Sequence, residues 1–345
     1  MKVNPDDGAL PELTESTAAA TTESPTAATS EPAGSGEAPA TAPLVGLDAG
    51  LKAYKPVEGV SGAIKCVGSD TMNNLMTLWT EGFKRIYPNV TAEVQGKGSS
   101  TAPPALIEGT VNFGMMSRSL KADEIARFEQ AFGYKPTVVP TCIDMVGFYV
   151  HKDNPVASLT MPQLDAIFSK SRSLGFATDV VKWGEVGATG EFADASISLF
   201  GRNPASGTYT FVKDHILGGG DFKDAVKSQP GSAGVVQGVG KDRFAIGYSG
   251  IGYITPDVKA LPVAKAEGEE PVAPTAENAY SGAYPLWRNL LIVVNAKPGE
   301  PLDPLRREFI KFIFSQEGQT AVIKDGYIPV KGDIADKTLA DLKIE

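Results

Sequence analysis

The sequence has no hydrophobic run long enough to cross a membrane, and its 345 residues include only two cysteines and two histidines. A membrane-spanning helix needs about 20 mainly apolar residues, so none is expected. So few cysteines and histidines exclude a zinc site built from them. A carboxylate site stays open, but no calcium-loop spacing occurs, and we expect neither a metal nor a cofactor. Basic residues are not in excess, and the net charge of -9 argues against binding to duplex nucleic acid.

Aromatic residues are absent before Tyr54, and the first part of the chain is mostly Ala, Thr, Ser, Pro, Glu and Gly. Such a composition buries too little apolar surface to offset the entropy of ordering. We therefore predict a disordered tail over residues 1–56, either a linker or a tether to a surface, and dispensable for binding up to about Ala53. The N-terminal sequence does not read as a signal peptide. That leaves a cytoplasmic location or a processed, extracytoplasmic one.

Beyond residue 60, short apolar stretches alternate with segments of helical periodicity. A helix is predicted from Met72 to Tyr87, a second around 105–108, and a late amphipathic one over Leu305–Ile313. The predicted strands are 63–67, 90–94, 111–115, 138–141, 145–150, 245–248 and 290–294. Strands that alternate with helices through short loops indicate a mainly parallel α/β sheet.

Three predicted strand-to-helix junctions combine glycine with small hydroxyl side chains. They are residues 68–72, 96–101 and 201–208, and the third holds Arg202 and Ser206-Gly207-Thr208. Free N–H groups at a helix start attract anions, glycine lets the backbone approach a ligand, and hydroxyls donate hydrogen bonds. Each junction alone is more simply explained by helix capping. Three together, with an arginine whose planar fork matches phosphate oxygens, favour an oxyanion site.

A fourth segment places Ser117 and Arg118 just after the third predicted strand. Ligands of open α/β sheets bind beyond the carboxyl ends of the strands. The pair is therefore a candidate for the same site. A solvated arginine at the start of a loop is the alternative.

In this order, the segments resemble the PstS-type phosphate-binding proteins of bacterial phosphate ABC importers. The most specific part is Arg202 with Ser206-Gly207-Thr208, and the supporting segments extend from Ile64 to Val330. The resemblance implies an α/β, type II periplasmic-binding-protein fold, in which two lobes are joined by two crossing strands, near 145–150 and 284–295. The implied division is residues 57–146 plus 288–345 for lobe 1 and residues 147–287 for lobe 2.

The resemblance further implies that phosphate binds dehydrated between the lobes, which would close on it. No catalytic residue is expected. In some family members an aspartate stands in the place of Ser117, and its carboxylate accepts the proton of hydrogen phosphate. Here Asp70 or Asp144 would take that role. The alternatives are that Asp70 caps a helix and that Asp144 forms hydrogen bonds at the hinge. The expected phosphate-binding residues are Ser69, Asp70, Thr71, Met72, Ser99, Ser117, Arg118, Asp144, Arg202, Ser206, Gly207 and Thr208.

The function implied is high-affinity binding of inorganic phosphate and its delivery to the permease subunits of an ABC importer. The protein would be a monomer in the periplasm or another extracytoplasmic space, with its tail as a membrane tether. A phosphatase or phosphotransferase is the first alternative, but neither histidine adjoins a candidate serine and no Walker-type loop is present. A surface phosphate sensor or adhesion module is the second. Cys66 and Cys142 are expected either as a disulfide or as buried thiols.

Overall fold

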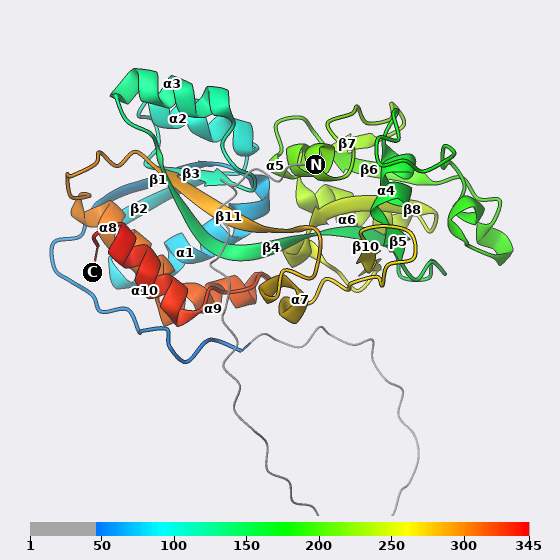
Figure 1. Cartoon of the computed structure of the whole chain (residues 1–345). Coiled ribbons are helices and arrows are strands. Elements are labelled where there is room, and N and C mark those ends of the chain that lie inside the picture. The colour runs from blue at the N-terminus through cyan, green and yellow to red at the C-terminus, as the bar shows by residue number, and fades with distance from the viewer. Residues whose placement is uncertain (1–45, 345) are drawn as a thin grey trace, which may run out of the picture. The chain divides into compact units, whose positions relative to one another are not determined.

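The computed structural model describes residues 46–344, in which strands and helices alternate along the chain (Figure 1). Its strands are β1 (Gly62–Gly68), β2 (Val90–Gln95), β3 (Phe113–Met116), β4 (Thr137–His151), β5 (Leu159–Thr160), β6 (Ser198–Arg202), β7 (Lys227–Gln229), β8 (Ala245–Gly250), β9 (Val258–Ala260), β10 (Val263–Ala264) and β11 (Trp287–Val294). Its α-helices are α1 (Asn73–Ile86), α2 (Ala102–Ile107), α3 (Ala122–Phe132), α4 (Met161–Phe168), α5 (Gly207–His215), α6 (Ser232–Lys241), α7 (Ala276–Tyr280), α8 (Pro304–Ile313), α9 (Gln316–Lys324) and α10 (Gly332–Asp341).

One long sheet organises these elements, with the strand order β2-β1-β3-β11-β4-β8-β6-β7 and β9 paired to β4. The strand β4 joins its two ends, because residues 137–145 pair with β11 and residues 146–150 pair with β8. We call β2, β1, β3 and β11 with their helices the first half, and β8, β6, β7 and β9 with theirs the second half. In the first half β1 is parallel to both of its neighbours, and in the second half β6 is parallel to both of its own. The strands β4 and β11 run antiparallel to their neighbours.

Helices cover both faces of the first half, as the side chains of β11 show. Successive side chains of a strand point to opposite faces. Leu290 and Ile292 accordingly join the core under α1 and α8, whereas Leu291 and Val293 join the one under α2 and α3. Figure 1 shows α2 and α3 on one side of this part of the sheet and α1, α8, α9 and α10 on the other.

The predicted strands and the amphipathic helices of the first half are confirmed. The segments 138–141 and 145–150 are parts of the single strand β4, because no turn interrupts the run between them. The predicted helix from Met72 begins with a short 3₁₀ turn, η1 (Asp70–Met72), before α1. Cys66 and Cys142 are buried free thiols, and their strands β1 and β4 are separated by β3 and β11.

The prediction of a disordered tail is wrong for residues 46–56, which pack against the C-terminal helices. Leu51 is only 3% exposed. The backbone N–H and the side-chain amide of Gln316 donate to the carbonyls of Lys52 and Leu51, at 2.9 and 2.8 Å. Leu51 and Tyr54 thus supply the apolar surface that the preceding sequence lacks. The rest of this prediction, on residues 1–45, lies outside the described residues.

We expect a chain that begins at Val57 to be less stable than one that begins at Gly46. The shorter chain would lose the buried side chain of Leu51, which is worth about 1.5–3 kcal/mol, and the bonds to Gln316. Its free energy of unfolding should therefore be about 2–4 kcal/mol lower. Urea unfolding of the two chains measures this difference, and equal stabilities would contradict the packing of this segment.

Candidate functional site

Five buried hydroxyl side chains meet where the two halves touch: Ser69, Thr71, Ser99, Ser117 and Thr208. The Ser69 hydroxyl donates to that of Ser117 at 2.8 Å, and the Ser117 N–H donates to Ser99 Oγ at 3.1 Å. The hydroxyls of Thr71 and Thr208 lie 3.1 Å apart and come from opposite halves. We call these five residues the hydroxyl cluster. Hydroxyls both donate and accept hydrogen bonds, so the cluster matches an oxyanion in more than one protonation state.

The first half positions its hydroxyls at the carboxyl ends of parallel strands, as expected for an open α/β sheet. Ser69 and Thr71 follow β1, Ser117 follows β3, and Ser99 lies in a 3₁₀ turn after β2. Gly98 lets this last turn approach the second half. Its φ is +106°, and a Cβ there would lie 2.5 Å from the carbonyl oxygen of Ala205.

The second half contributes the N-terminus of α5. Ser206 is its N-cap, and its hydroxyl accepts from the N–H groups of Thr208 and Tyr209 at 3.2 and 3.4 Å. This hydroxyl therefore serves the helix, as the capping interpretation predicts. The next residue, Gly207, is so close to the cluster that a Cβ there would lie 2.3 Å from Ser99 Oγ and 2.5 Å from Ser117 Oγ.

Arg202 ends β6 and is buried beside the cluster, with its side chain 1% exposed. One terminal nitrogen donates to Ser232 Oγ at 2.6 Å, and the other donates to the Pro230 carbonyl at 3.1 Å and lies 3.2 Å from Asp70 Oδ1. Burial lowers the pKa of Arg202, and the nearby Asp70 carboxylate opposes that shift. Its Nε is buried and has no hydrogen-bond partner among the described residues. This atom is therefore a donor that remains for an anion.

Arg288 of β11, which no sequence motif indicates, lies at the centre of the site. Arg288 is the cross-strand partner of Asp144 of β4, and its Nε and Nη2 donate to Asp144 Oδ2 at 2.9 and 2.7 Å. The same guanidinium donates to the Ser117 carbonyl at 2.8 Å and to Thr208 Oγ1 at 3.0 Å. Burial raises the pKa of Asp144, and Arg288 acts in the opposite direction. The signal in the sequence is weak: Arg288 is the second residue of β11, two positions before the apolar run that starts at Leu290.

Two predicted ligands are placed differently from the others. The Met72 side chain lies in the core, and its N–H donates to the Ser69 carbonyl at 3.2 Å, within the turn. Arg118 donates to both carboxylate oxygens of Glu124, at 2.8 and 2.7 Å. The structure thus pairs this guanidinium with α3 and does not bring it to the hydroxyl cluster.

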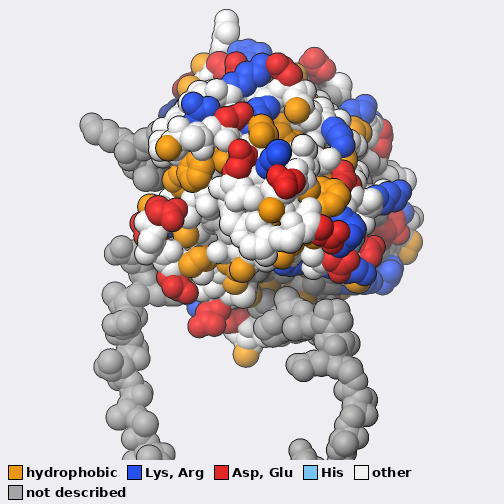
Figure 2. All heavy atoms as spheres, turned by 90° about the vertical axis from the view of Figure 1, so that its right-hand side faces the viewer, with side chains coloured by type: hydrophobic (Ala, Val, Ile, Leu, Met, Phe, Trp, Pro, Cys, Tyr) orange, Lys and Arg blue, Asp and Glu red, His pale blue; other side chains and the backbone are white. Residues whose placement is uncertain are grey.

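Charge is evenly mixed on the face of the second half that Figure 2 shows, where acidic and basic side chains alternate over the surface. Exposed pairs such as Lys170–Asp224 and Arg243–Glu191 belong to this half. Pairs of this kind contribute little and are screened by salt. On this face, therefore, no patch of one sign of charge stands out.

The carboxyl group of Asp325, at the end of α9, makes a pH-dependent contribution to stability. One of its oxygens is buried without a hydrogen-bond partner, and burial raises its pKa to about 7. The folded protein binds the carboxyl proton of Asp325 more tightly than the unfolded chain does. The stability that this proton contributes is therefore lost as pH rises from about 4 through about 7.

We expect Asp325→Asn to raise the free energy of unfolding by about 1–2 kcal/mol at pH 8, after solvent screening, and by nearly nothing at pH 4. Urea unfolding at both pH values measures this, and a gain that does not depend on pH would contradict it.

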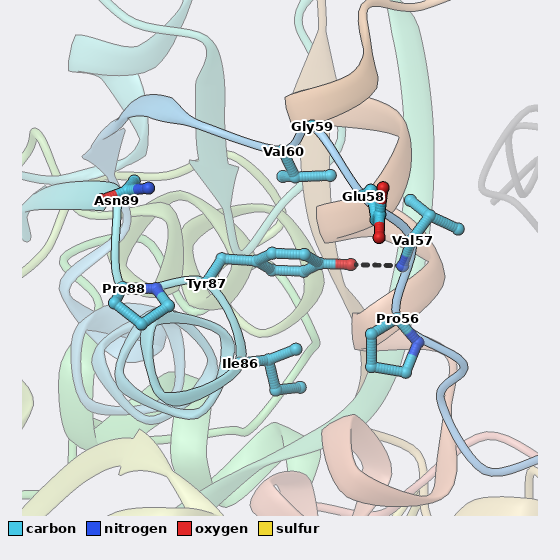
Figure 3. Close-up of a pocket in the computed structure, with 9 residues that line it drawn as sticks. All are labelled: Pro56, Val57, Glu58, Gly59, Val60, Ile86, Tyr87, Pro88 and Asn89. Atoms are coloured by element: carbon cyan, nitrogen blue, oxygen red, sulfur yellow. Dashed lines mark hydrogen bonds between the residues drawn. The ribbon is translucent and has the colours of Figure 1, made fainter.

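A surface pocket of about 370 Å³ lies apart from this site (Figure 3). It is formed by residues 56–60 and 86–89, around the ring of Tyr87, whose hydroxyl accepts from the Val57 N–H at 3.0 Å. These segments adjoin the amino ends of β1 and β2, whereas the hydroxyl cluster follows the carboxyl ends of β1 and β3. The pocket and the cluster are therefore at opposite ends of these strands.

Within residues 46–344, no group of three or more His, Cys, Asp or Glu side chains is arranged to hold a metal ion. The helices of the same residues include none that is long and apolar enough to cross a membrane.

Comparison with known proteins identifies the family. The model of the PBP superfamily domain matches residues 19–317. The phosphate-binding protein PstS of Pseudomonas aeruginosa is 50% identical over 299 residues, which cover 87% of this chain and 93% of that protein. PstS of Bacillus subtilis is 29% identical over 281 residues, 80% of this chain and 83% of that one.

A similar solved structure is that of a candidate phosphate ABC transporter substrate-binding protein with bound phosphate, from Clostridium perfringens. It has a TM-score of 0.65 and 29% identity, and the match covers 78% of this chain and 100% of that one. A phosphate transport receptor from Vibrio cholerae, with a TM-score of 0.60 and 24% identity, supports the fold alone. These matches confirm the predicted fold class. The chain therefore belongs to the PBP superfamily and, within it, to the PstS-type phosphate-binding proteins.

Proposed function

We propose that this protein binds inorganic phosphate between its two halves and delivers it to the permease subunits of an ABC importer. The observation that carries the proposal is the hydroxyl cluster, which brings groups from both halves together beside two buried arginines. Its relatives in Pseudomonas and Bacillus are named phosphate-binding proteins. We also propose that the halves act as the two lobes, with divisions near residues 146/147 and 287/288 on the strands that cross between them.

The proposed ligand groups are the hydroxyls of Ser69, Thr71, Ser99, Ser117 and Thr208, the backbone at Gly207, and the guanidinium of Arg202. Ser206 contributes by capping α5, and the Met72 N–H would bind only if its turn opens. Arg288 joins this set because it donates to Thr208 and to the Ser117 carbonyl. Arg118 is left out, since Glu124 holds it.

Charges at the site are balanced before an anion arrives. Asp70 lies beside Arg202, and Asp144 beside Arg288. Neutral donors at a helix N-terminus and in the cluster would therefore stabilise much of the charge of the anion. Asp144 has one oxygen held by Arg288 and the other by the Ile251 N–H, so the cluster hydroxyls are the better candidates to accept the proton of hydrogen phosphate.

The positions of the two histidines favour a binding protein over a hydrolytic enzyme. His215 lies at the C-terminal end of α5, where its Nδ1 is 2.9 Å from the Phe211 carbonyl. His151 ends β4, and its Nδ1 accepts from the Asp153 N–H. Hydrolysis needs an activated nucleophile with a positioned base, and among the described residues neither imidazole has a hydrogen bond to a serine of the cluster.

Calorimetric titration of the whole protein tests the proposal. Phosphate should bind with one site per chain. Sulfate should bind more weakly, because at neutral pH it has no proton to donate to a hydroxyl whose own hydrogen is already committed, as that of Ser69 is to Ser117. Incubation with a chromogenic phosphate ester tests the enzymatic alternative. Sulfate that binds as well as phosphate, or turnover that Ser117→Ala abolishes, would refute the proposed function.

We further propose that the protein is extracytoplasmic and monomeric. Cell fractionation would check its location, and analytical sedimentation would check its oligomeric state.

Arg202→Ala is expected to weaken phosphate binding by at least about tenfold. Hydrogen bonds to a charged group contribute about 1.5–3 kcal/mol each, and about 1.4 kcal/mol corresponds to one decade of affinity. Arg202→Lys should recover only part of the loss, because an ammonium group lacks the planar fork. Calorimetry measures both variants. A change of less than about threefold for alanine would remove Arg202 from the site.

A further inference from the structure

Three groups of the second half converge on Asp70 of the first half. Asp70 Oδ1 accepts from the backbone N–H of Ser232 at 2.7 Å and lies 3.2 Å from Arg202 Nη2. Its backbone carbonyl accepts from the hydroxyl of Tyr253 at 2.9 Å. Asp70 follows β1, whereas these partners belong to the start of α6, the end of β6 and a turn after β8. The residue is therefore bonded across the contact between the halves.

The surroundings of Asp70 make these contacts stronger than a surface ion pair. The side chain of Arg202 is 1% exposed and that of Asp70 is 22% exposed, so solvent screens the pair poorly. Ser232 is the first residue of the ten-residue helix α6. A carboxylate at a helix N-terminus bonds to a free N–H group and interacts favourably with the helix dipole.

Asp70 also fixes the orientation of Arg202. The two terminal nitrogens of that guanidinium contact Ser232 Oγ, the Pro230 carbonyl and Asp70, while the buried Nε has no partner among residues 46–344. Asp70 and the start of α6 thus hold the two terminal nitrogens of the guanidinium. The Nε–H remains as a donor for an anion.

We infer that Asp70 is an interlobe latch, whose carboxylate bonds Arg202 and the start of α6, stabilises the contact between the halves, and orients Arg202 for the anion. The consequence for phosphate affinity rests on the proposed function, but the contact itself does not. Apparent affinity scales with the fraction of molecules in the binding-competent conformation. Loss of the latch should therefore weaken binding by opening the protein, without removing a group that touches phosphate.

Two other roles for Asp70 predict different results. As acceptor of the phosphate proton, Asp70 would govern the preference for phosphate over sulfate and leave the contact of the halves unchanged. As an internal anion that competes for Arg202, it would lower affinity, and its removal would tighten phosphate binding.

The first experiment measures the distance between the halves by pulsed electron paramagnetic resonance, with spin labels at Gln130→Cys on α3 and Lys241→Cys on α6. Both positions are exposed, and the native thiols are buried. Without phosphate, Asp70→Asn and Asp70→Ala should shift the distances to longer values than in the wild type. Asp224→Asn, which breaks an exposed pair in the second half, is the matched control and should not.

A second pair of variants isolates the bond to α6. Ser232→Pro removes the N–H that Asp70 accepts from, at the first position of a helix, where proline is tolerated. Ser232→Ala keeps that N–H and removes only the hydroxyl. The proline variant also lacks the hydroxyl, so the two variants differ in the N–H. The latch predicts longer distances for proline than for alanine, and equal distances would overturn it. Near-ultraviolet circular dichroism confirms that each variant is folded.

The second experiment titrates the same variants with inorganic phosphate. Asp70→Asn should weaken binding about tenfold and speed dissociation, with the preference over sulfate kept. Tighter binding, or a loss of that preference with unchanged distances, would overturn the latch. If the wild type itself does not bind phosphate, the proposed function fails, and the distances measured without phosphate still decide whether Asp70 holds the halves together.

Discussion

Gly207→Ala is expected to lower phosphate affinity on the order of a hundredfold while leaving the protein folded. A Cβ at this position would lie 2.3 Å from Ser99 Oγ and 2.5 Å from Ser117 Oγ, and 3.1 Å from Ser99 Cβ. Both hydroxyls would have to turn away from their present bonds, or α5 would have to retreat from the first half. Overpacking costs about 1–3 kcal/mol, and the displaced donors add to this loss.

The fold itself should tolerate this change, because alanine is favoured over glycine in helices and Gly207 is the first residue of α5. Calorimetry with phosphate, together with thermal unfolding, separates the two effects. Gly46→Ala is the control, since a Cβ there would meet no atom of the described residues within 4 Å, and it should change neither quantity. Binding by Gly207→Ala within about threefold of the wild type would show that the halves do not approach at this point when phosphate binds.

The parts of the site that sequence predicted are those with a local signal. Glycine next to serine or threonine at the start of a helix is a motif only a few residues long. This motif is enough to indicate the segments that contain Ser69, Ser99 and Ser206. The structure brings the first two into one cluster with Ser117 and Thr208. The role of Ser206 as a helix cap was equally predictable, because capping needs only its own helix.

The remaining contacts could not be predicted because they depend on pairing between distant segments. Arg288 meets Asp144 through the register of two antiparallel strands, and no local pattern determines that register. Arg118 resembles a ligand in the sequence because its partner, Glu124, lies in the first turn of α3, and the pairing depends on how that helix packs. Likewise, the sequence around Leu51 and Tyr54 gives no sign of order, because Gln316 and Glu317 of α9, which bond to their backbone, are some 260 residues away.

Arg288→Met is expected to lower the free energy of unfolding by about 3–5 kcal/mol, the usual cost of leaving one member of a buried ion pair without its partner. Asp144 is fully buried, and Arg288 supplies two of its hydrogen bonds. Without the guanidinium, the carboxyl group would have to take up a proton or draw in water. The Ser117 carbonyl and Thr208 would also lose a donor, so phosphate binding should weaken as well.

A second substitution decides whether the charge of Asp144 causes this loss. Asp144→Asn in the Arg288→Met background removes the unpaired charge but keeps the shape of the side chain, so it should restore part of the stability, measured by urea unfolding at pH 7. Arg243→Met is the matched control, because its partner Glu191 is exposed, and it should cost less than about 1 kcal/mol. If the double variant is no more stable than Arg288→Met alone, packing against Phe211, over which the guanidinium lies at 5.3 Å, rather than the ion pair, makes Arg288 necessary. If the double variant recovers stability, the buried pair that joins β4 and β11 to Ser117 and Thr208 explains how the charge of Arg288 is kept in the interior of the site.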